Sequence, residues 1–229
     1  MIVGDRKPLE EIKEEVKGYK KLMILGCGTC VSVCMAGGEK EVELLASQMR
    51  MANKMANEEV EIVEATIQRQ CDQEYIEPIV EKARECDAVL SMACGAGVQL
   101  LADILEPMPV LPALNTRFIG IAQAEGTWAE RCRACGNCLL GIYAGICPIT
   151  ICPKGLVNGP CGGTNDGKCE TSNERDCAWY LIYNRLKKQG KLEVMTELAP
   201  LKVFSAQSHP AKVVNEAYLK AEMEDAHAK

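Results

Sequence analysis

Short apolar runs alternate with amphipathic stretches through the first 121 residues of the chain. Apolar runs typical of buried strands occupy residues 21–26, 60–63 and 88–92, with two further strand candidates at 110–114 and 118–121. Apolar positions at helical spacing predict intervening helices over residues 8–19, 38–55, 75–85 and 98–105. Strands that alternate with helices form βαβ units, which build a parallel sheet. The pattern therefore predicts an α/β domain over residues 1–125, with a parallel, Rossmann-like or flavodoxin-like sheet.

The rest of the chain has a different pattern. Residues 126–172 contain no long periodic element, which predicts a loop-rich module rich in cysteine. A helix is expected from about Thr171, because Thr171 and Glu174 have the spacing of a capping box. A second, strongly charged helix is expected over 210–224, so that residues 173–229 form C-terminal helices.

Composition narrows the class of protein. The net charge of −6 argues against a nucleic-acid-binding surface, which normally carries a strong basic patch. The first eleven residues are charged and lack the apolar region of a signal peptide, and no uncharged run is long enough to span a membrane. We therefore expect a cytoplasmic protein, in which a reducing environment makes a framework of structural disulfides improbable.

Half of the fourteen cysteines fall between residues 132 and 169, in the predicted module. The first three have the C-x2-C-x2-C spacing that begins the bacterial ferredoxin run, and a Cys-Pro pair follows after eight residues rather than three. Structural zinc instead prefers separated pairs of ligands. The spacing favours iron–sulfur ligation and leaves zinc open. The candidate cofactor ligands are Cys132, Cys135, Cys138, Cys147, Cys152, Cys161 and Cys169.

A second group of cysteines follows the predicted parallel strands. Because the carboxyl ends of parallel strands meet at one edge of a sheet, these cysteines should converge there. A ligated metal centre is favoured over a thioredoxin-like dithiol or inert buried thiols, and Cys71, in a loop after the second strand, is either a ligand or a spare. The predicted metal ligands at this edge are Cys27, Cys30, Cys34 and Cys94.

Other catalytic chemistry is not indicated. Cys86 and Cys177 lie in helical contexts and are interpreted as small apolar side chains. No glycine-rich dinucleotide motif follows a strand and no phosphate-binding loop motif occurs, so the chain shows no nucleotide or flavin site of its own. Neither histidine, His209 or His227, is well placed as a general base. We expect no catalytic residues in this chain.

Two segments carry a family resemblance: CPKGLVNGPCGGTNDGKCE at 152–170 and CAWYLIYNRLKKQGKLE at 177–193. Residues 130–195 resemble the methylenetetrahydrofolate reductase C-terminal domain family, which includes the small iron–sulfur subunit of the reductase of acetogenic bacteria. The cysteine-bearing α/β half before them also looks like that subunit.

The resemblance implies a non-catalytic redox subunit of a larger complex. Its expected partner is a TIM-barrel large subunit that carries the flavin and binds methylenetetrahydrofolate. Two or three [4Fe-4S] clusters would relay electrons from ferredoxin or another low-potential donor to that flavin. Zinc has been associated with such complexes, so one thiolate set is a candidate zinc site. The alternatives are a zinc-stabilised scaffold subunit that carries no electrons and a stand-alone thiol–disulfide oxidoreductase.

Overall fold

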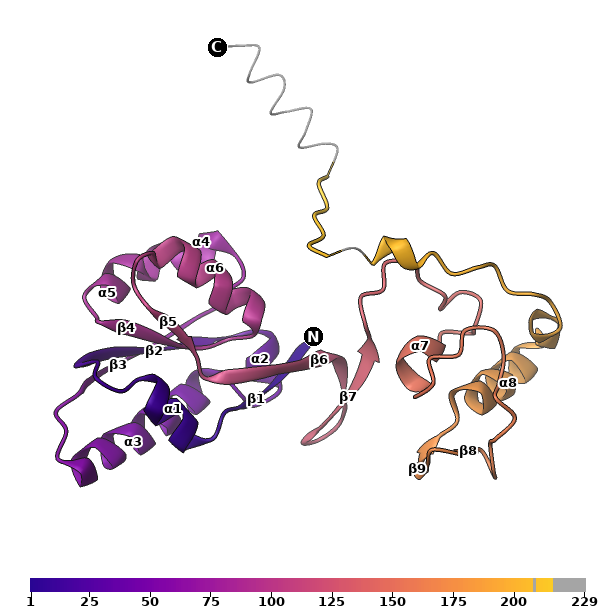
Figure 1. The fold of residues 1–229 in the computed structure, drawn as a ribbon, viewed down its shortest axis with the longest axis horizontal. Coiled ribbons are helices and arrows are strands. Elements are labelled where there is room, and N and C mark those ends of the chain that lie inside the picture. The colour runs from indigo at the N-terminus through magenta and orange to yellow at the C-terminus, as the bar shows by residue number, and fades with distance from the viewer. Residues whose placement is uncertain (208, 216–229) are drawn as a thin grey trace, which may run out of the picture. The chain divides into compact units, whose positions relative to one another are not determined.

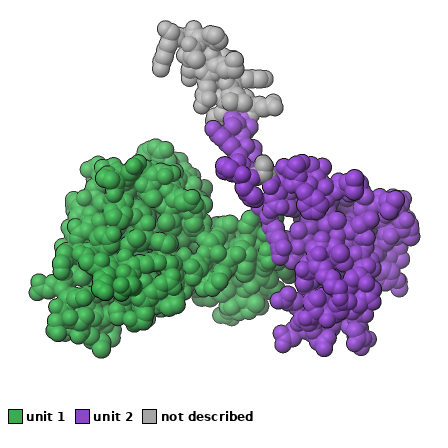
Figure 2. Space-filling view, in the orientation of Figure 1, with its two compact units in different colours: residues 1–132 green, residues 133–229 purple. Residues whose placement is uncertain are grey.

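The computed structural model describes residues 1–207 and 209–215. The chain divides into two compact units, Met1–Cys132 and Arg133–Lys229, shown in green and purple in Figure 2. Among the described residues, no helix is long and apolar enough to cross a membrane.

A four-stranded parallel sheet forms the centre of unit 1, as the sequence predicts. Its strand order is β3-β2-β4-β5, so the chain moves outward to β3 and then returns past β2 to β4. All five residues of β4 and six of the seven in β2 are buried, as expected for strands covered on both faces. The strands are β2 (Lys21–Cys27), β3 (Glu61–Ile67), β4 (Ala88–Met92) and β5 (Val110–Pro112).

Helices cover both faces of this sheet (Figure 1). One face bears α1 (Leu9–Glu15) and α3 (Glu39–Ala56). The opposite face bears α4 (Gln73–Ile76), the 3₁₀ turn η1 (Glu77–Ile79), α5 (Val80–Arg84) and α6 (Gly95–Leu105). Alternate side chains of β2 enter the two cores, with Leu22 and Ile24 on the α3 face and Met23 and Leu25 on the α6 face. Unit 1 is therefore a three-layer α/β structure.

Hydrogen bonds and close packing fix both ends of β2. The carboxylate of Asp87 accepts hydrogen bonds from the backbone N–H groups of Lys20 and Lys21, at 2.8 and 2.7 Å, and they hold its pKa below the usual value. At the other end, the carbonyl of Gly37 accepts from Cys27 N at 2.8 Å. A Cβ on Gly37 would lie 1.9 Å from the carbonyl oxygen of Met92, so only glycine lets this loop approach β4.

A second, antiparallel sheet completes unit 1 and differs from the prediction. It has the order β1-β6-β7, with β1 (Ile2–Arg6), β6 (Leu114–Ala124) and β7 (Thr127–Cys132). Of this sheet, the sequence patterns predict only Leu114 and residues 118–121 as strand. The bidentate ion pair between Arg117 and Asp5 joins β6 to β1.

The helix expected over 75–85 is broken into three short pieces. Pro78 lies in the middle of this stretch, and the backbone there forms the 3₁₀ turn η1 between α4 and α5. Proline lacks the N–H that a continuous α-helix requires, which accounts for the break. The second strand also differs, because β3 extends to Ile67 and so ends only four residues before Cys71.

The described residues of unit 2 (133–207 and 209–215) have little regular structure apart from one long helix. Its elements are α7 (Pro148–Ile151), β8 (Lys168–Cys169), β9 (Ser172–Asp176), α8 (Ala178–Gln189) and the 3₁₀ turns η2 (Leu192–Met195) and η3 (Phe204–Ala206). Trp179, Ile182 and Leu186 on α8 pack against the loop that precedes α7. Trp179 meets the ring of Tyr143 edge-on, with 5.1 Å between ring centroids, and donates from Nε1 to the carbonyl of Leu156 at 3.2 Å.

The helix predicted to start near Thr171 begins later. Ser172–Asp176 instead form β9, antiparallel to β8, and Cys177 occupies the N-cap of α8. The hairpin with β8 therefore overrides the capping-box pattern. The predicted helix over 210–224 lies mostly outside the described residues, and its described part, 210–215, is not helical.

Candidate functional site

The sheet-edge thiols lie where the direction of strand order reverses. In open parallel sheets, ligands bind outside the carboxyl ends of the strands at such a switch point, here between β2 and β4. Cys27 is the last residue of β2, Cys30 the first of α2 (Cys30–Val33), and Cys94 the N-cap of α6 after β4. All three are free thiols. The structure thus brings three of the four predicted sheet-edge cysteines to one end of the sheet.

Cys34 points in another direction. Its side chain is buried, and its sulfur donates to the carbonyls of Gly4 in β1 and Val31, each at 3.5 Å. Burial is the main cause that raises the pKa of this thiol, and the neighbouring Cys30 raises it further. The sulfur of Cys34 therefore faces the antiparallel sheet.

A glutamine that sequence reasoning missed organises the same edge. Gln70 is fully buried, and its Nε2 donates to the carbonyls of Leu25 and Gly26 in β2, at 2.8 and 3.1 Å. Its Oε1 accepts from the hydroxyl of Ser91 in β4 at 2.6 Å. The side chain ties two strands together and fixes the backbone immediately before Cys71. No local sequence signal distinguishes it from an ordinary loop glutamine.

Lysine and asparagine surround Cys135 in the module of unit 2. Burial opposes ionisation of Cys135, but the Lys202 ammonium and a backbone contact at Asn137 outweigh it, so the pKa is lowered. Lys202 is itself buried, donates from Nζ to the carbonyl of Asn137 at 2.6 Å, and lies over the ring of Phe204. A buried cation so close to the thiol favours the thiolate, which is the form that binds metal. No sequence pattern indicates this role for Lys202.

Two Cys-Pro pairs, at Cys147 and Cys152, flank the short helix α7. Cys147 is the N-cap of this short helix, and its sulfur accepts from the hydroxyl of Thr150 at 3.4 Å. Cys152 follows the helix and is buried, whereas Cys138 is exposed. The structure therefore presents these thiols from loops and helix ends, with hydrogen-bond support at Cys147.

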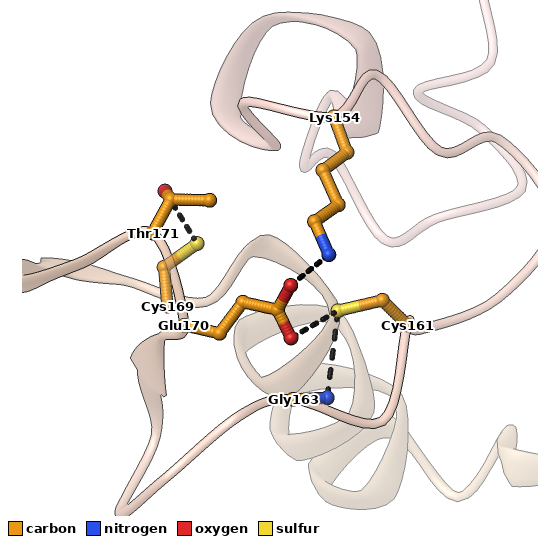
Figure 3. A network of polar contacts seen from close by, with 6 residues as sticks. All are labelled: Lys154, Cys161, Gly163, Cys169, Glu170 and Thr171. Carbon is orange, nitrogen blue, oxygen red and sulfur yellow. Dashed lines mark hydrogen bonds and ion pairs between the residues drawn. The ribbon is translucent and has the colours of Figure 1, made fainter.

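A polar network holds the last two module cysteines (Figure 3). One carboxylate oxygen of Glu170 pairs with Lys154, and the other accepts from the sulfur of Cys161 at 3.7 Å. The backbone N–H of Gly163 also donates to Cys161 at 3.5 Å. The sulfur of Cys169 lies 3.2 Å from the hydroxyl of Thr171, whose hydrogen bond is the main cause that lowers the Cys169 pKa.

The donor chemistry of both groups fits thiolate ligation. The candidates in unit 2 from Cys135 onward are free thiols, and lowered pKa values at Cys135 and Cys169 favour their metal-binding form. Within residues 1–207 and 209–215, no group of three or more histidine, cysteine, aspartate or glutamate side chains is arranged to hold a metal ion. Ligation at either group therefore requires the sulfurs to move closer together than they lie in this structure. Cys132, the remaining candidate, is the last residue of β7 and is exposed.

Comparison with known proteins bears on the second half of the chain. Residues 111–205 match the protein family described as methylene-tetrahydrofolate reductase C terminal, which confirms the resemblance over that segment. The matched range includes all seven candidate cofactor ligands of the module, whereas the sheet-edge cysteines lie outside it. No curated protein and no solved structure matches the chain.

Proposed function

From the premise that residues 111–205 match the methylenetetrahydrofolate reductase C-terminal family, we propose that the chain is the electron-transfer subunit of such a reductase. The observation that carries this proposal is the family match across a segment with seven closely spaced cysteines. A chain with many thiolate ligands and no flavin motif is suited to relay electrons, and a partner would then perform the reduction.

The module cysteines are the proposed ligands of [4Fe-4S] clusters, which supply one-electron transfer when bound. They are Cys132, Cys135, Cys138, Cys147, Cys152, Cys161 and Cys169. The residues around them support that role. Lys202 places positive charge beside Cys135, and Gly163 and Thr171 contribute hydrogen bonds to Cys161 and Cys169. Charge and hydrogen bonds near ligand sulfurs stabilise the thiolate and tune the reduction potential of a centre.

The proposed partner is a TIM-barrel flavoprotein that binds methylenetetrahydrofolate. Reduction of the methylene group to methyl takes two electrons, so a flavin in the partner would join one-electron transfer in this chain to that chemistry. The proposed donor is ferredoxin or another low-potential carrier. A zinc-stabilised scaffold that holds the flavoprotein without carrying electrons is the competing proposal, and metal content separates the two.

The test uses the full chain, purified without oxygen both alone and with a methylenetetrahydrofolate reductase flavoprotein. Iron, sulfide, zinc and flavin are quantified together, and flavin bleaching is followed after addition of reduced ferredoxin. We expect iron and sulfide in this chain, an EPR signal on reduction, and faster flavin reduction when the chain is present. A colourless chain that contains only zinc and does not accelerate flavin reduction would refute the relay.

A matched pair of variants sharpens the test. Cys135→Ser removes a proposed ligand and should reduce both iron content and the rate of flavin reduction. Cys177→Ser changes a buried cysteine at the N-cap of α8, where serine is a favoured residue, and should leave both readouts unchanged. Equal effects of the two substitutions would indicate general destabilisation in place of lost ligation.

A further inference from the structure

The edge of the parallel sheet carries a further cysteine, Cys71, that is not among its four predicted metal ligands. Cys71 lies in the segment after β3, and it is a free, exposed thiol. β3 is parallel to β2 in register through Ile67, opposite Cys27. The carboxyl end of β3 therefore delivers Cys71 toward the same edge that carries Cys27 and Cys94.

The segment between β3 and Cys71 is bound closely to the end of β2. The backbone N–H of Gly28 donates to the carbonyl of Ile67 at 2.8 Å, and the sulfur of Cys27 lies 4.0 Å from the carbonyl oxygen of Gln68. Gln70 then bonds the carbonyls of Leu25 and Gly26, the two residues before Cys27. Contacts on both sides of Cys27 thus hold the segment that ends at Cys71.

The first turn of α6 holds the other side of this segment. A Cβ on Gly97 would lie 2.9 Å from the Cβ of Gln70 and 3.2 Å from its carbonyl carbon. The absence of a side chain at Gly97 therefore lets α6 pack directly on the residue before Cys71. Cys94 is the N-cap of that same helix, so this contact places the backbone of Cys94 close to the segment that carries Cys71.

Cys34 lies outside this arrangement. Its sulfur donates to the carbonyl of Gly4 in the antiparallel sheet and to that of Val31, each at 3.5 Å, so it is directed away from the segment that carries Cys71.

We propose that Cys27, Cys30, Cys71 and Cys94 form a four-thiolate metal centre at the switch point of the sheet, and that Cys34 is not a ligand. One C-x2-C pair and two single cysteines supply four sulfurs, a complete set for a tetrahedral zinc ion or an iron–sulfur cluster. Binding converts four thiols to metal thiolates, and the four protons pass to solvent. This centre lies outside the matched family segment, and it stands whether or not the module carries clusters.

The test compares Cys71→Ser with Cys34→Ser and Cys86→Ser in the full chain. Each protein is reconstituted without oxygen in two separate arms, one with Zn²⁺ alone and one with Fe²⁺ and sulfide. Metal is then quantified per chain. In the reconstitution with the metal that the site binds, Cys71→Ser should contain less metal per chain than wild type, by the content of one centre. Cys34→Ser and Cys86→Ser should keep the wild-type metal content. Wild-type content in Cys71→Ser in both arms, or the same loss in Cys34→Ser, would overturn the proposal.

Thiol protection in the unmodified chain provides a second readout that depends on no variant. In metal-loaded protein, alkylation mapped by mass spectrometry should spare Cys27, Cys30, Cys71 and Cys94 together, and a chelator should expose Cys71 and Cys94 together. Rapid alkylation of Cys71 in the loaded protein would overturn the proposal. Protection that a reductant removes and a chelator does not would overturn it in favour of a disulfide. Neither readout uses the flavoprotein, so failure here is distinct from failure of the electron relay.

Discussion

Replacement of Gln70 by methionine tests the clamp that joins β2, β4 and the loop of Cys71. The side chain is fully buried, and it donates to the carbonyls of Leu25 and Gly26 at 2.8 and 3.1 Å. It also accepts from the Ser91 hydroxyl at 2.6 Å. Methionine is similar in length to glutamine and fills irregular gaps, so the substitution removes polar contacts without opening a large cavity.

The expected cost follows from these three hydrogen bonds. The two bonds to backbone carbonyls contribute about 1 kcal/mol each, and stranding the buried Ser91 hydroxyl costs about 1–3 kcal/mol more. We therefore expect Gln70→Met to lower the unfolding free energy of unit 1 by at least about 3 kcal/mol. This value corresponds to a change of about 100-fold in the opening equilibrium.

Hydrogen exchange of the full chain, read by mass spectrometry in peptides from β2 and β4, measures this change. The slowest amides in such strands report the largest opening free energies of the unit. They should exchange about 100-fold faster in Gln70→Met, whereas Gln68→Met, at an exposed position two residues earlier, should stay within about 0.5 kcal/mol of wild type. Wild-type exchange in Gln70→Met would refute the proposed role of the clamp.

A double-mutant cycle with Ser91→Ala separates the hydroxyl contact from general packing. Ser91→Ala alone leaves the Oε1 atom of Gln70 buried without its donor. In the double variant neither partner is stranded, so its cost should be smaller than the sum of the single costs by about 1 kcal/mol or more. Strict additivity would contradict the assigned contact between the two side chains.

Three further substitutions test other contacts. Gly37→Ala places a carbon 1.9 Å from the carbonyl oxygen of Met92, and we expect a loss of about 3 kcal/mol or more in denaturant unfolding. Ile182→Ala truncates a fully buried side chain of α8 and should cost about 2–5 kcal/mol by hydrogen exchange of that helix. Asp87→Asn removes a carboxylate with a lowered pKa in the folded chain. Its contribution is present above the unfolded pKa of about 3.9 and is lost as pH falls through the folded value. Urea titrations in acid should therefore show a steeper loss of stability in wild type than in the variant.

Each of these substitutions has a matched control. A Cβ on Gly141 would meet no atom within 4 Å, so Gly141→Ala should be nearly neutral, and equal costs at the two glycines would refute the steric argument. Lys188→Ala changes an exposed residue of α8 and should leave the exchange of this helix as slow as in wild type. Equally slow exchange in Ile182→Ala would contradict the core role of Ile182. Asp103→Asn matches the change in net charge of Asp87→Asn at another exposed position. Parallel acid profiles for wild type and Asp87→Asn would contradict the hydrogen-bonded role of that carboxylate.

The parallel sheet was predictable because its strands are continuous apolar runs. The expected bounds of β4 agree with the structure, and β2 differs by one residue. Strands that are buried on both faces are apolar at nearly every position, so the continuous apolar run alone identifies them in the sequence. β1 lacks this signal, because three of its five residues are Gly4, Asp5 and Arg6, and its partner β6 begins more than a hundred residues later. Its pairing is a tertiary contact that no local pattern contains.

The candidate site was predictable only in part, for a related reason. The positions of Cys27 and Cys94 follow from the ends of apolar strands. The position of Cys71 depends on hydrogen bonds from Gln70 to backbone carbonyls of a strand 45 residues earlier. Cys34 was placed with Cys30 because they are one helical turn apart, but its sulfur turns to the carbonyl of Gly4. The cation beside Cys135 comes from Lys202, in an irregular segment whose sequence gives no signal of it.

The switch point of the parallel sheet has a consequence for the order in which the protein matures. The cysteines at the sheet edge follow three successive strand ends between residues 27 and 94, so their segments come to one edge only after β2, β3 and β4 have taken up their register. Contacts of such long sequence separation form late in folding. The first three module cysteines lie within seven residues and need no sheet to bring them together. If both proposed centres bind metal, metal supplied during synthesis would reach the local module thiols first, and the sheet edge would be loaded only in a chain that has already folded.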